Sequence, residues 1–270
     1  MSFTVEILPA FTDNYIYLVS DSDLGLAMAV DPGDADVVLR ALKERDLYLS
    51  LILNTHHHKD HIGGNAKLAR EYGAPIIGPA REKSRIENMA RGVEKGDVVT
   101  FSTLRGKVIE THGHTSGHIA FHFPQIKALF CGDTLFSLGC GRLFEGTAAQ
   151  LWSSLQELRG LPDDTLIYCG HEYTEANAKF ARAIDKNNVA LQERADAAAE
   201  LRRRGKPTLP ALLGNEKRVN PFLRADDIEF HKALAKSGFP VHDADPAAIL
   251  GSLRAAKDRF NIQQSTTGGN

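Results

Sequence analysis

The sequence has few cysteines, no excess of basic residues and no long apolar run. Of its 270 residues three are cysteine, and 32 Lys and Arg residues nearly balance 34 Asp and Glu residues, leaving a net charge of −2. So few thiols indicate free cysteines in a reducing compartment, and the charge balance offers no attraction for nucleic acid. No apolar run approaches the roughly 18 residues of a membrane span, and the first six residues resemble no secretory signal. We therefore expect a cytoplasmic protein without nucleic acid or membrane partners.

The residue pattern changes near residue 173. Before it, short β-type runs alternate with turns and a few helical stretches. After it, Ala, Glu, Arg, Leu and Lys dominate with helical spacing in residues 188–204, 226–237 and 246–260, and no strand pattern returns. We predict a mixed β and α catalytic unit in residues 1–173 and a helical unit in residues 174–270.

A histidine-rich loop, residues 55–61 (THHHKDH), follows the apolar run of residues 49–53. Imidazole nitrogens and carboxylate oxygens suit zinc, iron or manganese. In an extended chain His56 and His58 point to the same side because side chains alternate. Asp60 and His61 follow where the chain turns into a helix, so this one loop can supply ligands to two ions. His57 and Lys59 are expected to point away.

Other metal ligands must come from elsewhere in the chain. His114, Asp133 and His171 each lie beyond a β-type run and directly follow a glycine, which lets the backbone turn sharply at a sheet edge. Each alone would be an ordinary turn residue. Together with the histidine loop they complete a ligand set.

Several motifs occur in the order found in a known superfamily. They are Asp31 in the DPG turn, the T-H-x-H-x-D-H loop, GHTSGH (113–118), CGDT (131–134) and CGHE (169–172). The chain resembles the metallo-β-lactamase superfamily and, within it, the hydroxyacylglutathione hydrolases (glyoxalase II). The narrower likeness rests on TDNYIY (12–17), GCGRLFEG (139–146), CGHEYT (169–174), NPFLR (220–224) and LRAAKDRF (253–260), so it covers nearly the whole chain.

The resemblance implies an α+β fold, an αββα sandwich, followed by an all-helical domain that binds glutathione. It also implies a binuclear site with zinc as the expected metal and iron or manganese as alternatives. The implied ligands are His56, His58 and His114 for one ion, Asp60, His61 and His171 for the other, and Asp133 as the bridge. Asp31 would hydrogen-bond to a ligand histidine.

Two divalent cations at such a site would activate a shared water to hydroxide. Asp60 and Asp133 are thus expected to act in catalysis through this metal-bound hydroxide, which attacks a thioester carbonyl. A thiolate can leave without a strong general acid, since thiol pKa values are about 8.5. The resemblance implies hydrolysis of S-(2-hydroxyacyl)glutathione, chiefly S-D-lactoylglutathione, to glutathione and D-lactate, the second step of methylglyoxal detoxification.

Arg254 and Lys257 lie three residues apart on a predicted helix and so share one face. The family pattern places them at the glycine carboxylate of glutathione, with Arg142 and Tyr173 as further contacts. Phe144 stands where some members carry a tyrosine, so one hydrogen bond to glutathione is expected to be missing. A monomer is expected.

Two alternative functions would also make use of the histidine loop. One is a glutathione persulfide dioxygenase with a single iron, and the other is a non-catalytic metal-binding protein. The seven-ligand set and the cationic helix argue against the first, and the completeness of the ligands argues against the second. A β-lactamase would need a different C-terminal part, and a tRNA-processing nuclease would need a basic surface.

Overall fold

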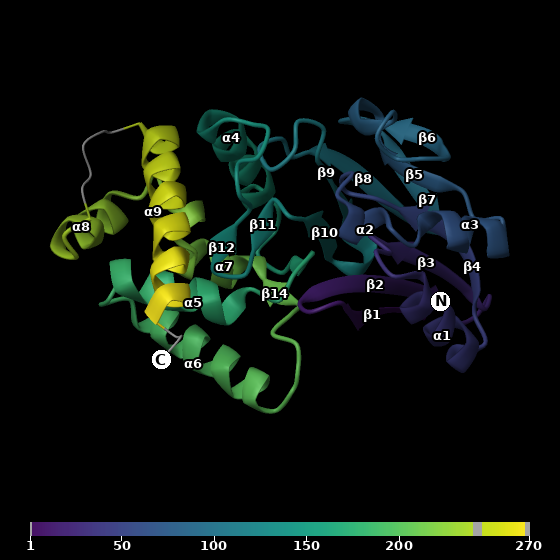
Figure 1. Ribbon diagram of the computed structural model, residues 1–270, viewed down its shortest axis with the longest axis horizontal. Coiled ribbons are helices and arrows are strands. Elements are labelled where there is room, and N and C mark those ends of the chain that lie inside the picture. The colour runs from purple at the N-terminus through teal and green to yellow at the C-terminus, as the bar shows by residue number, and fades with distance from the viewer. Residues whose placement is uncertain (1, 240–244, 268–270) are drawn as a thin grey trace.

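The computed structural model describes residues 2–239 and 245–267 and contains two stacked sheets beside a group of helices (Figure 1). The first sheet runs in the spatial order β1 (Phe3–Ala10), β2 (Asn14–Asp21), β3 (Leu26–Val30), β4 (Tyr48–Leu53), β5 (Ile76–Pro79) and β6 (Met89–Val93). The second runs in the order β14 (Ala211–Leu212), β13 (Leu166–Cys169), β10 (Ala128–Gly132), β9 (Ile119–Phe123), β8 (Leu104–Glu110) and β7 (Val98–Phe101). A hairpin of β11 (Leu135–Phe136) and β12 (Gly139–Cys140) lies outside both sheets.

Helices cover the outer faces of the two sheets. In the mixed unit they are α1 (Ala35–Arg45), α2 (Lys59–Ile62), α3 (Asn65–Tyr72), α4 (Ala148–Arg159) and the single turns η1 (Ala80–Glu82) and η2 (Pro124–Ile126). Beyond β13 follow α5 (Thr174–Ile184), α6 (Val189–Arg203), α7 (Leu213–Val219), η3 (Pro221–Leu223), α8 (Ile228–Lys236) and α9 (Pro246–Thr267). Among the described residues no helix is long and apolar enough to cross a membrane.

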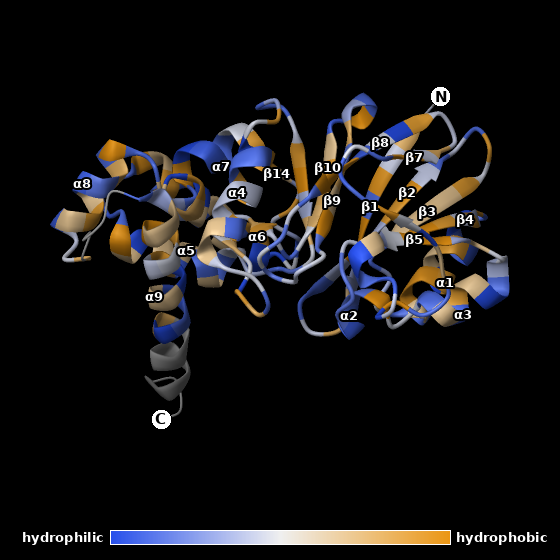
Figure 2. Ribbon diagram, turned by 90° about the horizontal axis from the view of Figure 1, so that it is seen from above, coloured by the Kyte–Doolittle hydropathy of each residue, from blue (hydrophilic) through white to orange (hydrophobic). Residues whose placement is uncertain are grey.

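Strand β2 shows how the layers are specified. Its side chains alternate between the two faces of the sheet. Tyr17 and Val19 belong to the core between the sheets, whereas Ile16 and Leu18 pack with the apolar sides of α1 and α3. In Figure 2 the strands are mostly white to orange, and the loops at one end of the sheets are white to blue. The αββα sandwich expected from the resemblance is the observed fold.

The C-terminal part differs from the expectation in one detail. No strand was expected after residue 173, yet β14 pairs antiparallel with β13 and extends the second sheet. Two residues are too few to show an alternating pattern, so a strand of this length cannot be recognised in the sequence. Strands β5 and β6 are short and contain proline or glycine, so their β-type pattern in the sequence is weak. The other regular elements that the structure describes after residue 173 are helices.

Candidate active site

The histidine loop is anchored behind its ligands. It leaves β4 beside the turn that leaves β3, because these strands are parallel neighbours. Asp31 in that turn accepts hydrogen bonds from the backbone N–H of Thr55 at 2.8 Å and from its hydroxyl at 2.7 Å. Gly33 lies so close to α2 that a Cβ there would stand 1.8 Å from the carbonyl oxygen of Asp60. The turn therefore sets where α2 presents its acidic and imidazole side chains.

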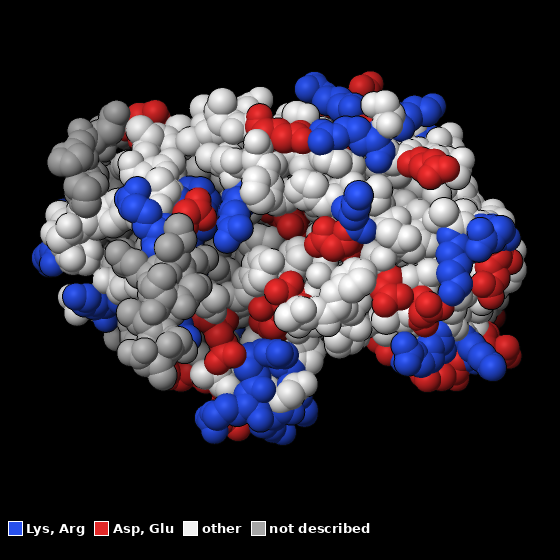
Figure 3. Space-filling model, viewed as in Figure 1, with Lys and Arg blue, Asp and Glu red and all other residues white. Residues whose placement is uncertain are grey.

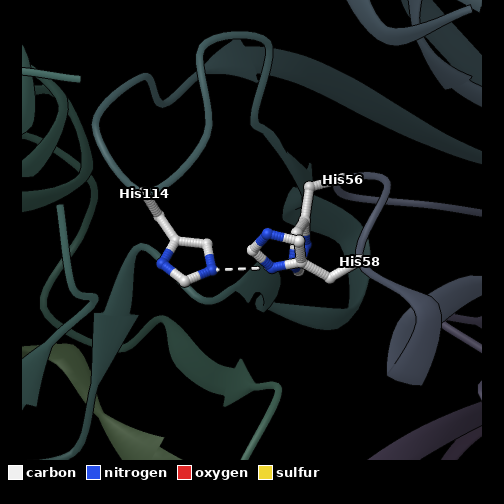
Figure 4. A group of neighbouring side chains, drawn as sticks. All are labelled: His56, His58 and His114. Atoms are coloured by element: carbon white, nitrogen blue, oxygen red, sulfur yellow. Dashed lines mark hydrogen bonds between the residues drawn. The ribbon is translucent and has the colours of Figure 1, made fainter. Parts of the chain in front are cut away.

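Three histidines from both sheets meet at one point and form what we call the histidine triad: His56, His58 and His114 (Figure 4). Nδ1 of His58 lies 3.0 Å from Nε2 of His56 and 3.1 Å from Nε2 of His114. His56 and His58 come from the loop after β4, and His114 from the loop between β8 and β9. Three ring nitrogens that converge in this way form a ready ligand set for a divalent metal.

A second group lies beside the triad and consists of Asp60, His61 and His171. Nε2 of His61 lies 3.3 Å from Nε2 of His171, and Oδ2 of Asp60 lies 3.4 Å from each of these nitrogens. We call these three residues the aspartate cluster.

Asp133 stands between the two groups. Its Oδ2 is 3.5 Å from His114 Nε2 and 3.3 Å from His171 Nε2, and its Oδ1 is 3.5 Å from His61 Nε2. The Oδ1 atom is buried and has no hydrogen-bond partner in the part of the chain that the structure describes. The structure thus brings together all seven side chains that the sequence predicted as ligands.

The ligand histidines are oriented by bonds on their other ring nitrogens. Nδ1 of His114 donates to the carbonyl oxygen of Arg142 at 3.0 Å, which leaves Nε2 with its lone pair. Nδ1 of His61 lies 3.2 Å from Asp31, where Asp31 was predicted to act, and Nδ1 of His171 lies 2.8 Å from Asp13. Such outer bonds fix the tautomer and the ring plane of a metal ligand.

Burial and neighbouring charges keep the triad histidines neutral and the carboxylate of Asp133 ionised. Burial lowers the pKa of all three triad histidines, to about 4 for His58, so their rings are neutral and able to give a lone pair. Burial alone would raise the pKa of Asp133, but His171 and His61 hold it well below its ordinary value. The carboxylate of Asp133 is therefore ionised, which is the state in which a carboxylate can bind a metal.

A cavity of about 420 Å³ opens onto the site, and His114 and Asp133 form part of its wall. All five residues that the sequence predicted to bind substrate line it: Arg142, Phe144, Tyr173, Arg254 and Lys257. Figure 3 shows a hollow on this face with Lys and Arg atoms on the α9 side and Asp and Glu atoms within it.

Two of the cations that line the cavity, Arg254 and Lys257, are buried. Arg254 is 5% exposed, and its Nη1 donates to the carbonyl oxygen of Cys140 at 2.9 Å. Its Nε is buried without a hydrogen-bond partner among the described residues. Lys257 is 2% exposed and donates to the carbonyl oxygen of Ala176 at 2.6 Å. Burial and the nearby Arg254 lower the pKa of Lys257 to about 7. Nη2 of Arg254 also pairs with Oδ1 of Asp258 at 3.1 Å, so the buried Nε of Arg254 and the neighbouring Lys257 are the groups that could still receive an anion.

Two family models together match most of the chain. One, described as the metallo-beta-lactamase superfamily, matches residues 14–171, and the other, described as the hydroxyacylglutathione hydrolase C-terminus, matches residues 172–260. The hydroxyacylglutathione hydrolase of Rhodospirillum rubrum is 48% identical over 95% of this chain and 98% of its own length. That of Methylococcus capsulatus is 44% identical over 95% of this chain and 99% of its own. The chain belongs to the hydroxyacylglutathione hydrolase family.

Solved structures share the fold more distantly. That of ETHE1 from Myxococcus xanthus is 27% identical with a TM-score of 0.64, over 95% of this chain and 98% of that one. The protein TTHA1623, solved in a di-iron-bound form, is 27% identical with a TM-score of 0.56, over 82% of this chain and all of that one. These similarities are weaker than those to the hydroxyacylglutathione hydrolases.

Sequence reasoning gave no role to three residues of this hydroxyacylglutathione hydrolase site. Asn14 donates to Oδ2 of Asp60 at 2.9 Å, and Asp13 bonds to His171 as described above. Both lie in the TDNYIY motif, so the motif was noticed but its contacts were not. Lys179, an exposed cation of α5, also lines the cavity, and nothing in its local sequence distinguishes it from a surface lysine.

Proposed function

We propose that the chain hydrolyses S-(2-hydroxyacyl)glutathione, chiefly S-D-lactoylglutathione, to glutathione and a 2-hydroxy acid, the second step of methylglyoxal detoxification. One observation carries the site assignment. The buried Oδ1 of Asp133 lacks a hydrogen-bond partner among the described residues and faces imidazole nitrogens. A buried, ionised carboxylate oxygen in this position is costly unless a cation completes its surroundings.

The residues present fit a pair of divalent metal ions. The histidine triad would hold one ion, the aspartate cluster would hold the other, and Asp133 would contact both. Histidine and carboxylate without thiolate favour zinc and also accept iron or manganese. When bound, such a pair supplies an activated water nucleophile at neutral pH and a Lewis acid for the thioester carbonyl.

The remaining residues bind and orient the substrate. Arg254 and Lys257 attract a carboxylate of the glutathione part into the far end of the cavity, where the buried Nε of Arg254 is ready to donate. Arg142 and Tyr173 line the same cavity and can serve as further donors. The thioester then lies against His114 and Asp133, and Asp60 and Asp133 act through the metal pair that they hold.

The ring of Phe144 lines the same cavity and lies at steep angles to two rings of the triad. Its centroid lies 5.2 Å from that of His114 and 5.8 Å from that of His58. It provides apolar surface and no hydrogen bond. The side chain is 61% exposed, so it stands at the cavity mouth rather than in the core.

The test is hydrolysis of S-D-lactoylglutathione, followed by the loss of thioester absorbance, with the metal content measured on the same samples. We expect turnover with about two metal ions per chain and a much higher KM for the double variant Arg254→Ala/Lys257→Ala. Arg259→Ala, an exposed cation on the same helix, is the matched control and should behave as wild type. Absence of hydrolysis in a sample that carries two metals would overturn the proposal.

We further propose the chain's organisation and setting. Residues 1–173 form the catalytic unit and residues 174–270 the substrate-binding unit, a division supported by Arg254 and Lys257, which belong to the second part and line the cavity. A monomer suffices because one chain supplies every residue of the site. Size-exclusion chromatography with light scattering can test this oligomeric state.

The three cysteines are buried and unpaired, which supports a reducing, cytoplasmic setting.

A further inference from the structure

A buried carboxylate outside the ligand set lies close to the histidine triad. Glu82 is in η1, directly after β5 of the first sheet, and its side chain is 1% exposed. A charged group is buried to this degree only where several donors satisfy it. The donors of Glu82 come from two different loops.

The first donor is His57 of the histidine loop. Its Nδ1 lies 2.8 Å from Oε2 of Glu82, so His57 is turned away from the triad but is not a solvated side chain. It was expected only to point away. Because His57 lies between His56 and His58 in the sequence, its bond to Glu82 also restrains the loop that carries these two residues.

The other donors belong to the loop between β8 and β9 of the second sheet. The hydroxyl of Thr115 and the backbone N–H of Gly117, the latter at 3.1 Å, donate to Oε1 of Glu82. Gly117 approaches so closely that a Cβ there would stand 2.5 Å from Cγ of Glu82. Thr115 directly follows His114, the member of the triad that this loop supplies.

Glu82 thus joins the two loops at their tips. The roots of the same loops are joined by the N–H of Ile119, which donates to the carbonyl oxygen of Thr55 at 3.0 Å. Bonds at the tips and at the roots together restrict the angle between the two loops more than bonds at one place alone. The distance of 3.1 Å between His58 and His114 depends on that angle.

We propose that Glu82 is a positioning residue that holds the histidine triad together by tying its two loops across the sandwich. The inference rests on the proposed metal centre. The aspartate cluster takes no ligand from the loop between β8 and β9. Loss of the tie should therefore weaken binding at the triad and spare the other ion.

The experiment is titration of the metal-free full chain with Co²⁺, against a competing chelator and with the visible spectrum recorded. For Glu82→Ala we expect one of the two ions to bind at least roughly tenfold more weakly, within the range for lost outer-sphere contacts. The other ion should bind within about twofold of wild type. Glu82→Gln keeps an acceptor for Thr115 and Gly117 and can donate to His57, so it should rescue most of the affinity.

Two further variants keep the result interpretable. Thr115→Val removes one donor to Glu82 and should weaken the same ion by roughly two- to tenfold, even if Glu82→Ala fails to fold. Lys59→Ala, exposed in the same histidine loop, should match wild type. Wild-type affinity in both Glu82→Ala and Thr115→Val, or equal weakening of both ions, would overturn the inference. A wild-type chain that binds no metal would instead overturn the proposed function beneath it.

Discussion

The ring of Tyr173 lies parallel to the imidazole of His171, with 4.8 Å between centroids and 1° between planes. The ring of Tyr173 therefore stacks on His171, a proposed metal ligand, and the same side chain lines the cavity. The two functions of this side chain can be separated by mutation.

Tyr173→Phe keeps the stacked ring and removes the hydroxyl. We expect KM to rise by roughly two- to tenfold, the effect of one lost hydrogen bond, with kcat and metal content unchanged. Steady-state kinetics and elemental analysis check both. Tyr48→Phe, which removes an exposed hydroxyl from the far part of the first sheet, is the control. A fall in metal content in Tyr173→Phe would show that the hydroxyl has a structural role instead.

Lys257 should make substrate capture sensitive to pH. Its pKa is lowered to about 7 by burial and by Arg254, so above that pH the free enzyme loses the charge that attracts a carboxylate. We expect kcat/KM, which reports ionisations of the free enzyme, to fall as the pH rises through about 7. In Lys257→Arg the charge persists and this fall should disappear. An identical pH profile in both proteins would exclude Lys257 as its source.

The same lysine should affect stability with the opposite slope. Its pKa is lower in the folded state than its ordinary value of 10.5, so the unfolded chain binds the extra proton between about pH 7 and 10.5. The free energy of unfolding therefore receives a contribution that rises with pH in this window. Urea denaturation across the window should show a smaller rise in Lys257→Met than in wild type. Equal slopes would contradict the assignment.

Asp133→Asn should disrupt the metal site more than any outer contact does. The amide lacks the charge that both groups of ligands face. We expect the metal content to fall from about two ions to one or none, and kcat/KM to fall by more than about a hundredfold, beyond the range for outer contacts. Dialysis, elemental analysis and kinetics measure this. Asp164→Asn, an exposed carboxylate paired with Lys127, should change neither.

Glu216 should support the hairpin that precedes Arg142. This buried carboxylate of α7 accepts bonds from the hydroxyl of Ser137 and the N–H of Leu138, each at 2.7 Å. Glu216→Ala leaves these donors unsatisfied and should lower the free energy of unfolding by roughly 2–4 kcal/mol. Glu216→Gln, which keeps an acceptor, should cost less than about 1 kcal/mol. Equal urea midpoints for the two variants would show that the hydrogen bonds contribute little.

The histidine loop was predictable because its information is local. His56 and His58 show their common direction in the alternation of an extended chain, and the residues after them begin a helix. His114, Asp133 and His171 were candidates because each follows a β-type run and a glycine, but their assignment to particular ions rested on the family resemblance, since their meeting point depends on which strands are neighbours. Local sequence alone could not bring residues so far apart in the chain to one edge of the sandwich.

The contacts around the ligands were the least predictable part. Glu82 has no motif around it, and its role arises because η1 lies between two loops that are distant in sequence. Asn14 stands in a recognised motif, but its bond to Asp60 exists only after β1 and β2 have paired beside α2. Such roles follow from tertiary packing, which no local pattern encodes.

The short strand β14 makes the two halves of the chain physically inseparable. It occupies the outer edge of β13, whose other edge is taken by β10. A protein cut after residue 173 would expose the hydrogen-bonding groups of that edge next to apolar side chains, which is a template for aggregation. The part of the chain that we propose to bind the substrate therefore also covers an edge of the sheet from which Asp133 projects.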